Sequence, residues 1–119
     1  MKAFRELQVW QKAHELTLLL YRSTASFPRD EAYGLTKQIR RASASIPANL
    51  AEGCGRSGNP EFARFCSIAM GSASELEYHL LLARDLSLLA PKEHAMLDQR
   101  TTEVKRMLAA LWRKVKAEC

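Results

Sequence analysis

The sequence has few residues that break regular structure, few cysteines and no long apolar run. Five glycines and four prolines in 119 residues leave long stretches uninterrupted. The three cysteines, Cys54, Cys66 and Cys119, form no CxxC pair, which argues against a disulfide framework or a cysteine-rich zinc site and favours a reducing, cytoplasmic compartment. Apolar runs such as 18–21 and 80–83 are far shorter than the roughly 20 residues of a membrane span, and no secretory signal opens the chain. We therefore expect a soluble protein with no membrane association.

The composition is that of a single globular domain covering residues 1–119. Apolar residues make up 47% of the chain and charged residues 26%, which is enough apolar material for one core. Lysine and arginine number 18 against 13 acidic residues, which gives a formal charge of +5. A basic excess of this size permits attraction to phosphate polymers, but alone it concerns only solubility and non-specific association.

Apolar residues recur at helical spacing in four segments, with little of the strict alternation that strands show. Short turns that contain proline or glycine separate the segments, so consecutive helices should be antiparallel neighbours. We predict an all-α protein, an up-down-up-down four-helix bundle. Its helices are expected at Leu7–Ala25, Glu31–Cys54, Pro60–Leu88 and Pro91–Lys116.

Small residues and a proline mark the second half of the second predicted helix. Its seam of apolar and small residues, from Leu35 to Gly53, stays in register on both sides of Pro47. We therefore predict one helix kinked at this proline, with two separate helices as the alternative. The stretch Ser43–Arg56 is rich in small side chains, and the third helix is small again at 71–74. Small residues let helix backbones approach closely, so we expect these two segments to pack together.

Four polar residues on the second and third helices are candidates for a buried structural network: Asn49, Glu52, Ser72 and Glu75. Paired amides and carboxylates would fix the register of the two helices, and a catalytic role is the alternative. Glu75 and His79 are the nearest approach to a di-iron motif, but the chain has no second Glu-x-x-His. We predict no metal, no cofactor and no catalytic residue.

Basic residues supply the remaining functional signal. Lys37, Arg40 and Arg41 lie opposite the apolar seam of the second helix, and Arg56 and Arg64 flank the loop that follows it. Cations on rigid helices hold a phosphate backbone without reading its sequence. We predict that these five residues bind nucleic acid, the alternative being an ordinary solvated face. The basic end of the last helix is interpreted as such a face, because the helix dipole favours cations there.

Two blocks of the sequence, Ser45–Gly53 (SIPANLAEG) and Ala69–Leu76 (AMGSASEL), resemble a known family. They are similar to the four-helix-bundle proteins encoded in intervening sequences of bacterial 23S ribosomal RNA genes, also labelled S23 ribosomal proteins. Accessory variability proteins of diversity-generating retroelements are similar as well. The opening 7–13 and Phe27–Pro28 extend the resemblance over nearly the whole chain.

The resemblance implies a four-helix bundle that assembles as a ring-like homopentamer without catalytic activity. For the retroelement relatives it implies a basic surface that binds nucleic acid and a reverse transcriptase partner. Our leading hypothesis is a non-enzymatic cytoplasmic oligomer that binds RNA or DNA through basic helix surfaces. The alternative is a protein-interaction scaffold, such as a reverse-transcriptase accessory protein. A metal enzyme, or a thiol enzyme using Cys54, is a third hypothesis.

Overall fold

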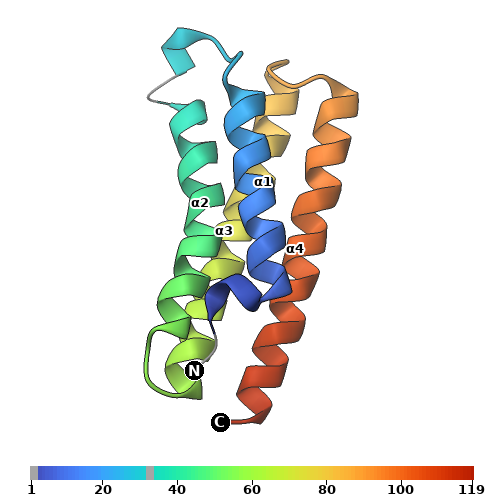
Figure 1. The fold of residues 1–119 in the computed structure, drawn as a ribbon. Coiled ribbons are helices and arrows are strands. Elements are labelled where there is room, and N and C mark those ends of the chain that lie inside the picture. Colours follow the sequence, from blue (N-terminus) through green and yellow to red (C-terminus); the bar gives the residue numbers. More distant parts are fainter. Residues whose placement is uncertain (1–2, 32–33) are drawn as a thin grey trace.

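The computed structural model describes residues 3–31 and 34–119, and within these ranges it is all-helical (Figure 1). Four long helices follow one another along an elongated molecule of 44 × 23 × 20 Å. Two short 3₁₀ turns lie before and after the first helix. The bounds are α1 (Gln8–Thr24), α2 (Leu35–Cys54), α3 (Asn59–Asp85) and α4 (Pro91–Ala117), with η1 (Phe4–Glu6) and η2 (Arg29–Glu31). The all-α prediction is confirmed.

The four helices pack around one hydrophobic cluster. α2 and α4 each contact both α1 and α3, so α1 and α3 lie diagonally across the bundle. In Figure 1 the connections between successive helices lie at alternate ends of the molecule. The outer faces of α1 and α3 are therefore separate surfaces of the protein.

The start of α2 differs from the prediction. The predicted helix began at Glu31, but Glu31 lies in the 3₁₀ turn η2, and α2 begins at Leu35. The Glu31 carboxylate accepts a hydrogen bond from the Leu35 amide at 3.3 Å, so it satisfies a free amide from outside the helix. Residues 32 and 33 of the predicted helix lie outside the described residues.

The end of α3 is also earlier than predicted, at Asp85 in place of Leu88. Ser87 has a left-handed φ of 62°, which interrupts the helical path. The Leu88 amide bonds back to the Ala83 carbonyl at 2.9 Å, which closes the helix end. Leu88 and Leu89 still turn toward the core. The helical spacing of apolar residues therefore continues past the end of the helix, which is why the sequence predicted a longer one.

Pro47 lies inside one continuous α2, so the alternative of two separate helices is wrong. Pro47 is buried, and Ile46 and Leu50, which flank it along the helix, are fully buried. The loss of one backbone hydrogen bond is thus accompanied by packing of the ring against neighbouring residues. The kink at this proline stays a prediction.

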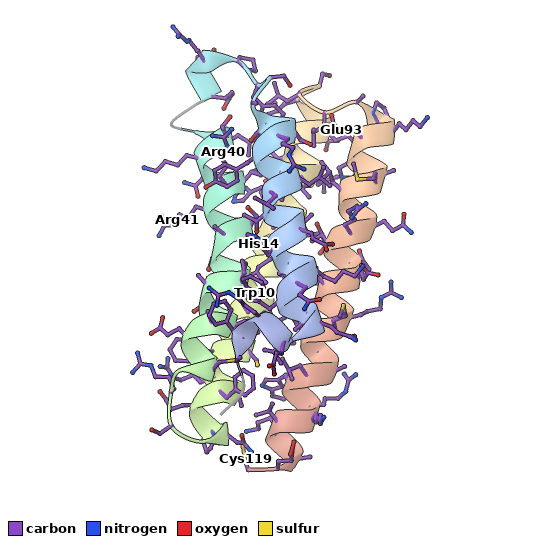
Figure 2. All side chains as sticks on the ribbon, in the orientation of Figure 1. Trp10, His14, Arg40, Arg41, Glu93 and Cys119 are labelled. Carbon is purple, nitrogen blue, oxygen red and sulfur yellow. The ribbon has the colours of Figure 1, made fainter. Side chains whose placement is uncertain are left out.

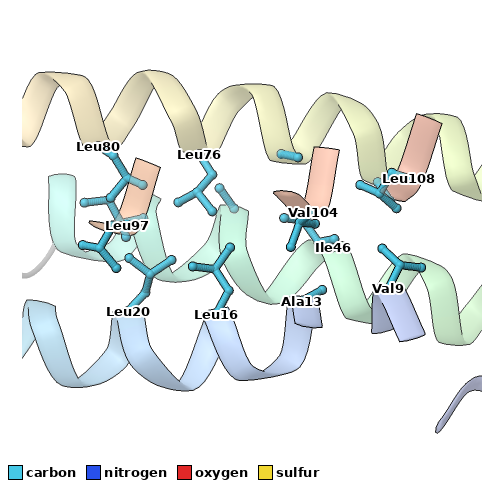
Figure 3. Packing of buried hydrophobic residues seen from close by; sticks show 14 of the residues in the cluster. Val9, Ala13, Leu16, Leu20, Ile46, Leu76, Leu80, Leu97, Val104 and Leu108 are labelled. Carbon is cyan, nitrogen blue, oxygen red and sulfur yellow. The ribbon is translucent and has the colours of Figure 1, made fainter. Parts of the chain in front are cut away.

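The core is built from layers of aliphatic side chains contributed by all four helices (Figure 3). Leucine supplies most of the large, fully buried side chains, and alanine fills the closer approaches. Residues in view in Figure 3 include Val9, Ala13, Leu16 and Leu20 of α1, Ile46 of α2, Leu76 and Leu80 of α3, and Leu97, Val104 and Leu108 of α4.

α2 and α3 approach each other closely at Gly53. A Cβ at this position would lie 2.9 Å from Phe65 Cβ and 3.0 Å from Phe62 Cδ1. Ala69 and Ala73 of α3 are fully buried, as the predicted packing of small segments requires. Gly71 is an exception, because a Cβ there would meet nothing within 4 Å. Gly71 and Ser74 are exposed, so only Ser72 and Ala73 of this small segment lie toward the bundle.

The two glycines give a matched pair of substitutions. Gly53→Ala should lower the free energy of unfolding by about 1 to 3 kcal/mol, because Phe65 Cβ is tied to the backbone and the helices must separate. Gly71→Ala should raise it by about 0.5 to 1 kcal/mol, since alanine is the better helix former and has room. Urea denaturation followed by circular dichroism, at one low protein concentration, measures both. Equal effects would contradict the close contact.

Candidate nucleic-acid interface

The outer face of α2 is basic because the large apolar residues of this helix lie on the other side. Leu35, Ile39 and Ile46 are buried at spacings that hold them on one stripe of the helix. Lys37 and Arg41, spaced by four residues, are exposed on the opposite side. Figure 2 shows Arg41 pointing away from the bundle. Since α2 has no acidic residue before Glu52, this part of the face carries only positive charge.

Arg40 is held in place by α1. Its Nε donates to Thr24 Oγ1 at 2.9 Å, and its Nη2 donates to the Tyr21 carbonyl at 3.1 Å. The guanidinium carbon lies 4.7 Å from the centre of the Tyr21 ring. The Tyr21 carbonyl is in the last turn of α1, where helix carbonyls lack intrahelical partners. Arg40 therefore joins α2 to the end of α1, while Lys37 and Arg41 project from the surface.

Arg56 and Arg64 lie at the far end of α2 and in the first turns of α3, and each forms an ion pair. Arg56 Nη2 is 2.7 Å from Glu52 Oε2, and Arg64 Nε is 3.0 Å from Glu61 Oε2. The hydrogen bond from Arg64 lowers the pKa of the Glu61 carboxyl. Both guanidinium groups also approach the Phe65 ring, at 5.3 and 4.5 Å. Exposed ion pairs of this kind contribute little to stability, but they offset the two positive charges.

The five predicted nucleic-acid residues thus do not form one cluster. Arg41 and Arg56 are fifteen residues apart, which corresponds to ~22 Å along a helix axis. The structure brings Lys37, Arg40 and Arg41 together at the start of α2, and Arg56 and Arg64 together at the α2–α3 loop. The first group has the free cations, because no salt bridge within the described chain involves Lys37 or Arg41.

A cavity that the sequence did not reveal lies beside the α2–α3 loop. It has a volume of about 450 Å³ and is closed on the other side by the last turns of α4. Arg56, Phe62, Lys114 and Glu118 are among the residues that line it. Asn59 Nδ2 donates to the Glu118 carbonyl at 3.4 Å across it. No local sequence pattern joins these elements, so only the fold could disclose the cavity.

Ser45, which the prediction did not include, joins two of the four predicted network residues, Asn49 and Ser72. Asn49 Nδ2 donates to the Ser45 carbonyl at 2.8 Å and to Ser45 Oγ at 3.0 Å. Ser45 Oγ and Ser72 Oγ are 2.8 Å apart, so a chain of hydrogen bonds connects α2 to α3. Glu52 accepts a hydrogen bond from Arg56, just beyond the end of α2, and Glu75 bonds to His79 in its own helix. The polar link between the helices is thus made by two hydroxyl groups and an amide.

The thiols and acidic groups show no reactive arrangement. Burial raises the pKa of the Cys66 thiol to about 11, and the neighbouring Cys54 adds to this effect. Cys66 is therefore protonated at neutral pH and is a poor nucleophile. Cys119 is exposed at the chain end. Within residues 3–31 and 34–119, no group of three His, Cys, Asp or Glu side chains could hold a metal ion.

The structure defines the chain as an all-helical protein of four long helices. Residues 5–110 match the model of the family described as 23S rRNA-intervening sequence protein, so the chain belongs to that family. The resemblance seen in the sequence is thereby confirmed. No helix in the described ranges is long and apolar enough to span a bilayer.

A solved structure supports the fold. It is a protein with unknown function from the S23 ribosomal protein family of Bacteroides thetaiotaomicron VPI-5482. Its TM-score to this chain is 0.79 at 23% sequence identity, and the match covers 87% of this chain and 97% of that one. A comparison with curated proteins finds no match.

The neighbouring arginines of α2 should differ sharply in their effect on stability. Arg40→Ala should lower the free energy of unfolding by about 1.5 to 3 kcal/mol, because it removes two hydrogen bonds from a charged donor to α1. Arg41→Ala should change it by less than about 0.5 kcal/mol, as is usual for an exposed surface residue. Urea denaturation of the two variants tests this. A similar loss in both would show that Arg40 does not join the helices.

Proposed function

We propose that the protein is a non-enzymatic cytoplasmic oligomer that binds RNA or other nucleic acid through the outer face of α2, without reading bases. The observation that carries the proposal is the exposed pair Lys37 and Arg41, one helical turn apart, on a surface with no acidic residue before Glu52. The family name also associates its members with ribosomal RNA genes. Arg56 and Arg64 are proposed as secondary contacts, because a phosphate would have to displace their present carboxylate partners.

The physical basis of this binding is the release of counterions from the phosphate backbone. Each lysine or arginine that neutralises a phosphate frees condensed cations, so affinity falls as salt rises. Because these cations lie on a folded helix, binding pays no free-energy cost for ordering the protein backbone. Because such contacts touch phosphates and not base edges, we expect little sequence preference.

A double substitution that spares Arg40 tests the proposed face. Lys37→Ala/Arg41→Ala should weaken binding to a structured RNA and reduce the slope of log K against log salt by about 1.5. Fluorescence anisotropy between about 50 and 200 mM salt measures both quantities. Lys92→Ala/Arg100→Ala on α4 removes the same charge from exposed positions and should have a smaller effect.

The outcomes separate clearly. Equal weakening by the two double variants would show that only net charge matters and that the α2 face is not the site. If the wild-type protein does not bind RNA or DNA even at the lowest salt concentration, the proposed nucleic-acid function is wrong.

A second candidate function, a protein-interaction scaffold, is favoured by the outer face of α3. Ile68, Tyr78 and Leu81 are exposed there by 40%, 58% and 38%. Gly71 lies in the same helix with open space beside it. A glycine in a helix interior costs about 1 kcal/mol relative to alanine, and no contact within the chain explains it. We propose that this face receives another copy of the chain in the homopentamer, or a protein partner such as a reverse transcriptase.

Self-association through the α3 face has its own test. Ile68→Glu should shift the protein toward smaller species in sedimentation velocity, because it places a charge within the proposed contact. Leu86→Glu is the matched control: Leu86 is 53% exposed but lies just beyond the end of α3, and its substitution should leave the size unchanged. An unchanged sedimentation coefficient for Ile68→Glu would exclude this face as the interface.

A further inference from the structure

We infer that the nucleic acid bound by this protein is single-stranded, and that its bases stack on an aromatic ladder along the outside of α1. The ladder consists of Phe4, Trp10, His14 and Tyr21. The inference rests on the proposed function, which concerns only the phosphate backbone, and it adds the class of ligand. The observations behind it are the ring geometry, the exposure of the outer rings and the charge of the adjacent helix.

The lower part of the ladder extends from the core to the solvent. Trp10 packs against the hydrophobic core, and the exposed His14 lies over it with ring centroids 5.0 Å apart and an interplanar angle of 13°. Phe4 meets Trp10 edge-on, also at 5.0 Å. The indole fixes the imidazole in a flat, stacked position. The outer face of His14 is thereby a rigid planar surface open to a ligand.

The upper part of the ladder is a second planar surface on the same side of α1. Tyr21 is 44% exposed, and the centre of its ring lies 4.7 Å from the guanidinium carbon of Arg40. Hydrogen bonds to Thr24 and to the Tyr21 carbonyl hold that guanidinium still. His14 and Tyr21 are seven residues apart, close to two full turns, or ~10 Å along the axis. This separation corresponds to about three stacked nucleotides at ~3.4 Å each.

The charge next to the ladder suits a phosphate backbone. Arg5 lies 5.1 Å from the Phe4 ring centre at one end, and Arg40 lies at the other. Figure 2 shows Trp10, His14 and Arg40 along the side of α1 that faces α2, with Arg41 further out on α2. The acidic residues of η1 and α1 are Glu6 and Glu15. A strand on the ladder would therefore place its phosphates toward the cations of α2.

This combination distinguishes a single strand from a duplex. Duplex bases are stacked on one another and expose only their edges, so they cannot lie on a protein ring. Sequence-tolerant single-strand binding combines a positive surface with aromatic rings on which bases stack. An exposed helix face with cations alone would bind both forms. The flat rings of His14 and Tyr21 add the property that favours unpaired bases.

The test compares an unstructured pyrimidine oligonucleotide with a duplex of the same length. His14→Ala leaves Trp10 and the core in place and should weaken binding of the single strand by about tenfold, within the range measured for one base–aromatic contact. His14→Phe should retain the affinity, because it keeps the ring. Duplex binding should be unchanged in both variants. Thermal unfolding of each variant serves as the control for folding.

Each result has a definite meaning. Equal wild-type affinity for the two forms, or a single-strand affinity unchanged by His14→Ala, would overturn the inference and leave backbone binding through α2 intact. A parallel loss of single-strand and duplex binding in His14→Ala would also overturn it. Absence of binding to either form at low salt would instead refute the proposed function itself.

Discussion

The close contact of α2 with α3 is the constraint on which the rest of the structure depends. At Gly53 the two helices approach so closely that one methyl group would collide with Phe65 Cβ. About two turns earlier along α2, the hydroxyl groups of Ser45 and Ser72 bond at 2.8 Å, so the two helices are joined at a second point. Close packing leaves no freedom to rotate α2 without breaking these contacts. The buried side of α2 therefore determines that Lys37 and Arg41 face the solvent.

A second set of contacts connects α2 to α1. Arg40 supplies two hydrogen bonds to the last turn of α1, and the Thr17 hydroxyl donates to the Ser43 carbonyl at 3.0 Å two turns earlier. Within this basic cluster, Arg40 therefore joins the two helices. Lys37 and Arg41 remain available to bind a ligand. Loss of binding in a variant that removes Arg40 would be ambiguous, because helix packing would change as well.

Periodicity in the sequence predicted the helices and their buried faces, but not the features set by contacts distant in sequence. The early end of α3 depends on the left-handed Ser87, and the late start of α2 involves the side chain of Glu31. Arg40 and Arg41 look alike in the sequence, and only the contacts of Arg40 with Tyr21 and Thr24 of α1 distinguish them. The outward direction of Gly71 was missed because a small residue in a helix suggests close packing on either side.

The placement of the proposed surfaces allows assembly and binding to act together. The apolar face belongs to α3, whereas the ladder and the free cations belong to α1 and α2, and α1 lies diagonally opposite α3. A copy seated on Ile68 and Gly71 would meet the other side of the bundle from His14 and leave it open. Repeated copies would then present several basic faces to one polymer, and linked sites bind far more tightly than single ones. In such an assembly, weak phosphate contacts by two cations per copy would suffice for tight binding. Contacts of this kind do not read sequence.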